Sequence, residues 1–308
     1  MSTAQLDNSH ITRHLGQTSE YAREYDPSLL VREPRQGNRT YLNLTHDSLP
    51  FCGYDIWNAY EVSAMTEKGL PVTAIAKIMY PCDNEYIVES KSIKLYLNSF
   101  NMARFGQTSE ECLDSIKEHV EADLSELLNT NVTVTLFTPS NTLREEHRPY
   151  FHKGYVTIED DIDLMDNINF DTFSEDPNLL TSSGYHGHNS YLNHQKFHSS
   201  LLKSNFRVTG QPDWGDVFIY MKSMMTLRPD NLAKYIVSFR DENHFHEEIC
   251  ECIYKRLLDT FKPTELAVTC LYARRGGIDI NPTRVSHVDL LHNRLIDPDI
   301  PFSKTPRQ

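Results

Sequence analysis

The sequence predicts an α+β protein in which antiparallel sheets are covered by helices on one face. Two observations lead to this prediction. The order strand, strand, helix, strand occurs once in each half of the 308-residue chain. Each half also contains one helical segment whose apolar residues recur at three- and four-residue spacings. Neither half offers a generous core of its own, so we expect the two units to share one continuous architecture.

The first unit is expected over residues 46–144, after a polar N-terminal extension of residues 1–45 that wraps the surface. An apolar run at Pro71–Tyr80 and the shorter run Tyr86–Ser90 are its first expected strands. A capping box then opens a helix, because Thr108 is followed three residues later by Glu111.

The apolar residues of this helix predict one buried face. They are Leu113, Ile116, Val120, Leu124 and Leu127. After a short polar turn, Val132–Phe137 alternates β-branched and threonine positions, which is typical of a half-exposed strand. Residues 145–199 follow as a long polar connection rich in His and Asp, with the acidic stretch 159–163.

The second unit, residues 200–308, repeats this order. Asp216–Met221 and Tyr235–Phe239 are its expected first strands. The next segment predicts a helix, because apolar residues recur every fourth position and Pro263 ends the pattern. These residues are Ile249, Ile253, Leu257 and Phe261. Leu266–Tyr272 is expected to be the matching strand.

Composition narrows the function. The formal net charge of −13 argues against a long polyanion as ligand, so a small molecule or a protein partner is expected rather than nucleic acid. The six cysteines show no C-x-x-C spacing and predict reduced thiols in a cytoplasmic protein. No segment approaches the roughly 18 apolar residues of a membrane span, and the N-terminus has no signal-peptide core.

Three short motifs bear chemically useful groups. Glu89–Tyr96 places a carboxylate, two hydroxyls and two ammonium groups at the end of an expected strand, which suits a phosphorylated cofactor or simply a solvated strand end. Gln211–Gly215 places Asp213 beside Trp214, as a proton donor or as a turn cap. Phe245–Glu248 opens the second helix, where His246 and Glu247 could contact a guanine-like base or cap the helix.

Histidines in the connection raise the alternative of a metal site. His186 and His188 are separated by one residue. His194 and His198 lie four residues apart, and two histidines at this spacing on a helix can bind one metal ion. The segment is polar and loop-like. We therefore expect structural or solvated histidines and no metal.

Together these motifs resemble the long, two-unit form of the NADPH-dependent 7-cyano-7-deazaguanine reductases, the nitrile reductases of queuosine biosynthesis and tRNA modification. The resemblance extends from Tyr25–Leu30 and Leu49–Phe51 to Arg274–Pro282 and is weakest over residues 145–199. It implies tandem tunnelling-fold units and reduction of the nitrile to an aminomethyl group with two NADPH. It also implies a homodimer with each pocket built between units.

The resemblance implies a role for each matching position. Asp213 is the proton donor. The deazaguanine is contacted by Val88, Glu89, Ser90, His246 and Glu247. NADPH is contacted by Ser90, Lys91, Arg275 and Gly276.

The chain departs from the family at Phe206, where the family has the cysteine that adds to the nitrile carbon and forms a thioimide. A phenyl ring has no nucleophilic atom, so this covalent step cannot start at residue 206. Ser204 and Thr209 are poor nucleophiles unless a base lies beside them, and nothing in the sequence places Cys52 at the site.

Three interpretations follow. The chain is a working nitrile reductase, or one whose cysteine was altered. Alternatively, it is a paralogue that performs a noncovalent reaction on a deazapurine or pterin, with Phe206 against the flat ring. The third is an inactive binding or assembly partner.

Overall fold

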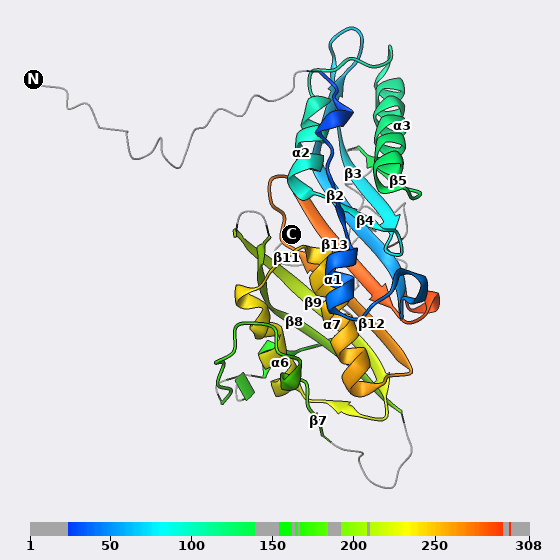
Figure 1. Cartoon of the computed structure of the whole chain (residues 1–308). Helices are drawn as coiled ribbons and strands as arrows, with labels where there is room; N and C mark the ends of the chain where they lie inside the picture. The colour runs from blue at the N-terminus through cyan, green and yellow to red at the C-terminus, as the bar shows by residue number, and fades with distance from the viewer. Residues whose placement is uncertain are drawn as a thin grey trace, which may run out of the picture.

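The computed structural model describes residues 24–138, 154–161, 164–165, 167–183, 192–207, 210–291 and 296. Most of its strands form one sheet with the order β11-β8-β9-β12-β13-β2-β3-β5, and β6 pairs with β8 at one side (Figure 1). The strands of the first half are β2 (Cys52–Met65), β3 (Pro71–Pro81) and β5 (Thr133–Phe137). Those of the rest of the chain are β6 (Val156–Thr157), β8 (Asn193–Phe206), β9 (Pro212–Ser223), β11 (Asn243–His244), β12 (Glu265–Tyr272) and β13 (Ile278–Val285).

The two halves of the chain share this sheet. Strand β13 pairs antiparallel with β2, from Ile278 opposite Ala59 to Val285 opposite Cys52. Among the named strands of the described residues, parallel pairing occurs only where the short strands β11 and β6 meet β8. Two small antiparallel pairs lie outside the main sheet: β1 (Arg32–Pro34) with β4 (Tyr86–Val88), and β7 (Ser182–Ser183) with β10 (Thr226–Leu227). The expected α+β class with mainly antiparallel strands is confirmed.

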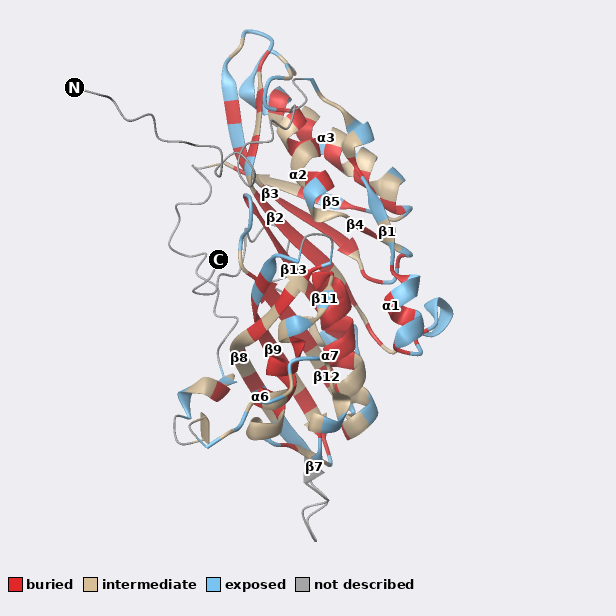
Figure 2. Ribbon diagram, turned by 60° about the vertical axis from the view of Figure 1, so that its left-hand side comes forward, coloured by how far each residue is buried: buried red, intermediate tan, exposed pale blue. Residues whose placement is uncertain are grey.

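Helices pack against one face of the sheet (Figures 1 and 2). They are α1 (Gln36–Tyr41), α2 (Ser90–Ser99), α3 (Ser109–Leu128), α6 (Pro229–Val237) and α7 (His246–Phe261). Short 3-10 helices lie at 27–29, 46–48, 158–160, 177–179, 238–241 and 288–290. Strand periodicity separates the faces: Trp57 packs in the core under α2 and α3, whereas Ile56 belongs to a separate cluster on the other face.

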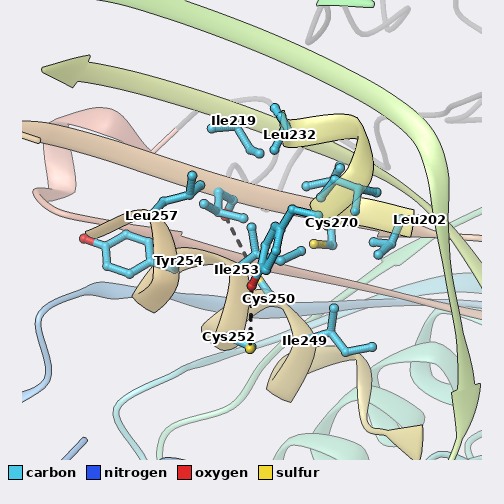
Figure 3. Packing of buried hydrophobic residues seen from close by; sticks show 14 of the residues in the cluster. Leu202, Ile219, Leu232, Ile249, Cys250, Cys252, Ile253, Tyr254, Leu257 and Cys270 are labelled. Atoms are coloured by element: carbon cyan, nitrogen blue, oxygen red, sulfur yellow. Dashed lines mark hydrogen bonds between the residues drawn. The ribbon is translucent and has the colours of Figure 1, made fainter. Parts of the chain in front are cut away.

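The two amphipathic helices form as the sequence predicts. Thr108 and Glu111 make the capping box of α3, and Ile116, Val120 and Leu124 are buried. In α7 all four residues of the predicted apolar face are buried (Figure 3). The helix ends at Phe261, where Lys262 adopts a left-handed conformation just before Pro263.

One predicted strand is wrong. Residues Tyr235–Phe239 lie in α6 and in the 3-10 helix of residues 238–241, although Tyr86–Val88, their supposed counterpart, does form a strand. The helix is favoured by Pro229 at its first position and by the spacing of Leu232 and Ile236, which outweigh the β-branched run. The true equivalent of α6 in the first half is α2, which the sequence analysis treated as a strand end.

Residues 24–45 contribute to the interior as well as to the surface. Helix α1 lies beside α7 (Figure 1), and its Arg39 binds Glu251 at 2.9 Å. Arg35, just before α1, binds Asp55 of β2 at 2.5 Å. Arg284 of β13 completes this fully buried charge cluster, since it contacts both Asp55 and Glu251.

The six cysteines carry free thiols. No helix among the described residues is long and apolar enough to cross a membrane.

Candidate active site

A pocket of about 210 Å³ lies where the start of α2 meets β9, β12 and the start of α7. Its first-half residues are Ser90, Lys91 and Lys94. Its second-half residues are Phe206, Gln211, Asp213, His246, Tyr272, Ala273, Arg275, Gly276, Ile278 and Ile280. Seven of the residues predicted from the sequence therefore line one cavity: Ser90, Lys91, Phe206, Asp213, His246, Arg275 and Gly276.

Glu89 builds the first-half wall of the pocket by capping α2. Its carboxylate accepts hydrogen bonds from the backbone N–H groups of Lys91 (2.9 Å) and Ser92 (2.7 Å). Ser90 and Lys91 consequently occupy the first turn of α2, and Lys94 follows one turn later. The helix N-terminus and the two ammonium groups make this wall positive, which suits an anionic ligand.

Asp213 is held by two basic side chains on the opposite wall. Its Oδ1 lies 2.8 Å from Nη1 of Arg275, and its Oδ2 lies 3.5 Å from Nε2 of His246. The Asp213 side chain is buried, and Oδ2 has no hydrogen-bond partner among the described residues. His246 meets Tyr272 edge-on, with ring centroids 4.0 Å apart. This arrangement provides one free carboxylate oxygen beside an imidazole.

Phe206 forms the apolar part of the pocket and is 3% exposed. Its ring makes an edge-to-face contact with Phe245 (5.9 Å between centroids) and clusters with Ile87. The Phe206 N–H donates to the carbonyl of Gln211 at 2.8 Å, in the turn that joins β8 to β9. The ring therefore lies where two strands and the start of α7 converge, on the same pocket as Asp213.

The remaining predicted residues lie around the pocket rather than on its surface. Val88 is buried in the first-half core, 1% exposed. Glu247 is 2% exposed, and its Oε1 has no hydrogen-bond partner among the described residues. Burial, and secondarily the negative charge of Asp55, raise the pKa of Glu247 to about 8. A pKa raised in this way favours the protonated form of the carboxyl at neutral pH.

No cysteine lines the pocket among the described residues. Ser204 lies opposite Asp213 in the β8–β9 register, but it is 1% exposed and outside the lining. Thr209 falls outside the described residues. Cys52 begins β2, points its Sγ to the carbonyl of Val285, and has a pKa raised by burial. That shift disfavours the thiolate.

Two of the histidines considered for a metal site, His194 and His198, do not lie on a helix. His194 and His198 belong to β8, and His198 lies between Asp216 (2.9 Å) and Thr157 (3.0 Å). His186 and His188 fall outside the described residues. Within the part of the chain that the structure describes, no three His, Cys, Asp or Glu side chains are grouped to hold a metal.

Three polar lining residues received no individual role from the sequence: Lys94 and Gln211, which lie within the predicted motifs, and Tyr272. Lys94 is one of the two ammonium groups of the Glu89–Tyr96 motif, and it lies three residues after Lys91 in α2. Tyr272 was predicted only as the end of a strand. Its alternation with Val268 and Cys270 places it on the helix-covered face.

Comparison with known proteins identifies the family. Residues 21–136 match the family model described as nitrile reductase, 7-cyano-7-deazaguanine-reductase N-term, and residues 212–289 match that of the QueF-like protein. The chain is 40% identical over 276 residues to a protein of Coxiella burnetii named NADPH-dependent 7-cyano-7-deazaguanine reductase, covering 89% of this chain and 92% of that protein.

Further relatives with this name agree. That of Colwellia psychrerythraea is 36% identical, with 96% of this chain and 95% of the relative covered, and that of Burkholderia thailandensis is 40% identical, with 89% and 93% covered. The archaeosine synthase QueF-Like in its apo form matches 33% of this chain and 99% of its own, at 16% identity and a TM-score of 0.29. On the sequence matches, the chain belongs to the family of NADPH-dependent 7-cyano-7-deazaguanine reductases.

Proposed function

We propose that this chain binds 7-cyano-7-deazaguanine together with NADPH in the pocket, and that it serves the nitrile-reduction step of queuosine biosynthesis in the cytoplasm. One observation carries the proposal. A single cavity collects cations from α2, the Asp213–His246–Arg275 group and Gly276, although these residues come from both ends of the sequence.

The charged side chains of the pocket suit the phosphate groups of a dinucleotide. Three cations line the pocket: Lys91, Lys94 and Arg275. Gly276 has φ +61°, and a Cβ there would lie 2.3 Å from Nζ of Lys94. The absence of a side chain at Gly276 therefore leaves Lys94 room to reach the cavity. NADPH supplies hydride when bound, and Ser90, Lys91, Arg275 and Gly276 are the residues that we assign to it.

Glu247 and His246 are assigned to the deazaguanine ring, together with Val88, Glu89 and Ser90. The edge of a guanine-type ring presents two N–H donors. A carboxylate can accept hydrogen bonds from both, whereas a protonated carboxyl has one oxygen that carries a proton and accepts less well. The unpartnered Oε1 of Glu247 supports this assignment. Ligand binding should therefore draw Glu247 into its ionised form and release a proton.

Asp213 is assigned to proton transfer at its Oδ2 atom. Arg275 occupies Oδ1, so Oδ2 is the oxygen that remains available to a ligand, next to Nε2 of His246. Conversion of a nitrile to an aminomethyl group consumes two hydrides and two protons, and the Asp213–His246 pair is positioned to deliver the protons.

Phe206 closes the covalent route in this chain. A thioimide needs a thiol at residue 206, and the ring there offers none. Reduction by the native chain must therefore proceed without a thioimide at residue 206. The flat ring in the pocket favours a second candidate function, noncovalent binding and reaction of another deazapurine or a pterin.

Assignment to this function also leads to a proposal for the domain organisation and the oligomeric state. We propose two tunnelling-fold units, with boundaries near residues 46–144 and 200–308, and a homodimer. Pairing of the sheet edges between subunits would also protect strands that otherwise invite aggregation.

Titration calorimetry tests the function. The native chain should bind 7-cyano-7-deazaguanine, and bind it more tightly when NADPH is present, whereas Lys91→Ala should lose the effect of NADPH. The matched control Lys117→Ala alters an exposed lysine on α3 and should behave as the native chain. Absence of binding by the native chain, with or without NADPH, would refute the proposal, and preferential binding of a pterin would favour the second candidate.

A further inference from the structure

His244 lies between two carboxylates just before α7. Its Nδ1 is 3.2 Å from Oε2 of Glu248, and its Nε2 is 3.1 Å from Oε2 of Glu242. Carboxylate oxygens only accept hydrogen bonds, so both contacts are favourable only when both ring nitrogens carry protons. The geometry therefore points to an imidazolium.

Glu248 connects this histidine to the first turn of α7. The same Oε2 atom accepts the backbone N–H of Phe245 at 3.1 Å, which closes the N-terminus of the helix. His246 and Glu247 are the next two residues. A displacement of Glu248 thus reaches the two side chains assigned to the deazaguanine, and it also reaches Phe245, whose ring packs on Phe206.

The charges around His244 come from three segments. Glu242 follows the 3-10 helix of residues 238–241, and its Oε1 accepts the N–H of Glu175. Glu248 belongs to α7, and Arg207, after β8, lies 3.1 Å from Glu248. Burial disfavours the charged ring, but the hydrogen bond and charge of Glu248, with the charge of Glu242, outweigh it and raise the pKa of His244. Arg207 opposes this effect.

We infer that His244 is a positioning residue for the pocket: its imidazolium fixes the start of α7, and ligand affinity falls when the ring loses a proton. A neutral ring keeps one contact and turns a lone pair toward the other carboxylate. The first turn of α7 then loses one of the two contacts that His244 makes with Glu242 and Glu248. His246 and Glu247 consequently lose their fixed orientation. The inference deepens the proposed function and rests on it.

The Gln variants separate charge from shape. His244→Gln is neutral at every pH and imitates the deprotonated ring. Glu242→Gln keeps an oxygen for the N–H of Glu175 and offers an amide N–H to a neutral His244. Both side-chain contacts of His244 should therefore persist at high pH in this variant. His287→Gln is the matched control, since His287 is exposed and lies outside the pocket lining.

The test compares 7-cyano-7-deazaguanine affinity between pH 6 and 9. At pH 6 the native chain should bind about fivefold more tightly than His244→Gln, the size expected for loss of one capping contact, and this ratio should fall to one at high pH. Glu242→Gln should retain its affinity where the native chain loses it. Because each ratio is taken at one pH, the titration of Glu247 cancels. Equal affinities of native chain and His244→Gln at every pH would overturn the inference.

Nitrogen NMR keeps the test independent of the ligand. The His244 ring should carry protons on both nitrogens at pH 6, and the Phe245 amide should exchange faster in His244→Gln than in the native chain. A single ring proton at pH 6, or unchanged exchange, would overturn the inference even if binding is seen. If no form binds the ligand while both NMR results hold, the proposed function fails and the positioning of α7 by His244 stands.

Discussion

The guanidinium of Arg275 lies 5.2 Å from the centre of the Phe206 ring, while its Nη1 binds Asp213. A cation over an aromatic face is an attractive contact. Phe206 thus packs against the residue that holds the proposed proton donor.

Replacing Phe206 by cysteine should lower stability. The ring is 3% exposed and contacts Phe245 and Ile87, so a thiol leaves a cavity. We expect a loss of about 2–4 kcal/mol in the free energy of unfolding, measured by urea denaturation. Phe173→Cys is the control, because Phe173 is 40% exposed and should change stability by less than about 0.5 kcal/mol. Equal stability of Phe206→Cys and the native chain would show that the ring is not packed.

Removing the cation at Lys91 should weaken NADPH binding. Lys91 lies in the first turn of α2 and lines the pocket, where a charge-assisted contact to phosphate is expected. Lys91→Ala should raise the Kd for NADPH about tenfold, equivalent to about 1.4 kcal/mol. The Kd for 7-cyano-7-deazaguanine should change less. An unchanged NADPH affinity would remove Lys91 from the cofactor site.

Glu247 should make folding stability fall as pH rises. Its pKa is about 8 in the folded protein and near the ordinary value of 4.5 when unfolded, so the folded state binds the extra proton between these values. Its contribution to stability is fully present below pH 4.5, is lost progressively up to pH 8 and is constant above. Chemical denaturation at several pH values should show this slope in the native chain and a shallower one in Glu247→Gln.

Glu118→Gln, which changes an exposed carboxyl of α3, should keep the native slope. The same slope in Glu247→Gln and the native chain would contradict the assignment.

The buried charge cluster should be sensitive to loss of one member. Arg284 is fully buried and contacts both Asp55 and Glu251. Arg284→Met leaves two carboxylates with fewer partners, and we expect a cost of about 3–5 kcal/mol in thermal or urea unfolding. Arg228→Met breaks an exposed pair with Asp230 and should leave stability unchanged. A small cost for Arg284→Met would mean that Arg35 and Arg39 suffice.

The sequence predicted correctly those features that depend on residues close together in the chain. The capping box and apolar face of α3, and the fourfold spacing in α7, depend on neighbouring residues and were predicted correctly. Tyr235–Phe239 was predicted wrongly, because β-branched residues were weighted above the proline that begins α6. The buried ions could not be foreseen, because Asp55 and Arg284 are far apart in sequence and are brought together by the β13–β2 pairing. Arg35 reaches Asp55 from the start of α1.

In the candidate site, too, the features that depend on the fold could not be predicted from local sequence. Motif resemblance assembled seven residues that the structure places on one pocket. The burial of Glu247 and the two carboxylates around His244 required the fold, because they arise where α7 meets the segment after α6 and the charge cluster under α1.

The most direct test of the central claim, that the pocket is intact and lacks only its nucleophile, is the intact mass and NADPH oxidation of Phe206→Cys incubated with 7-cyano-7-deazaguanine. The account predicts a covalent adduct without NADPH and the aminomethyl product with it, while the native chain forms no adduct. A variant that folds but forms neither adduct nor product would contradict the claim, as would an adduct on the native chain.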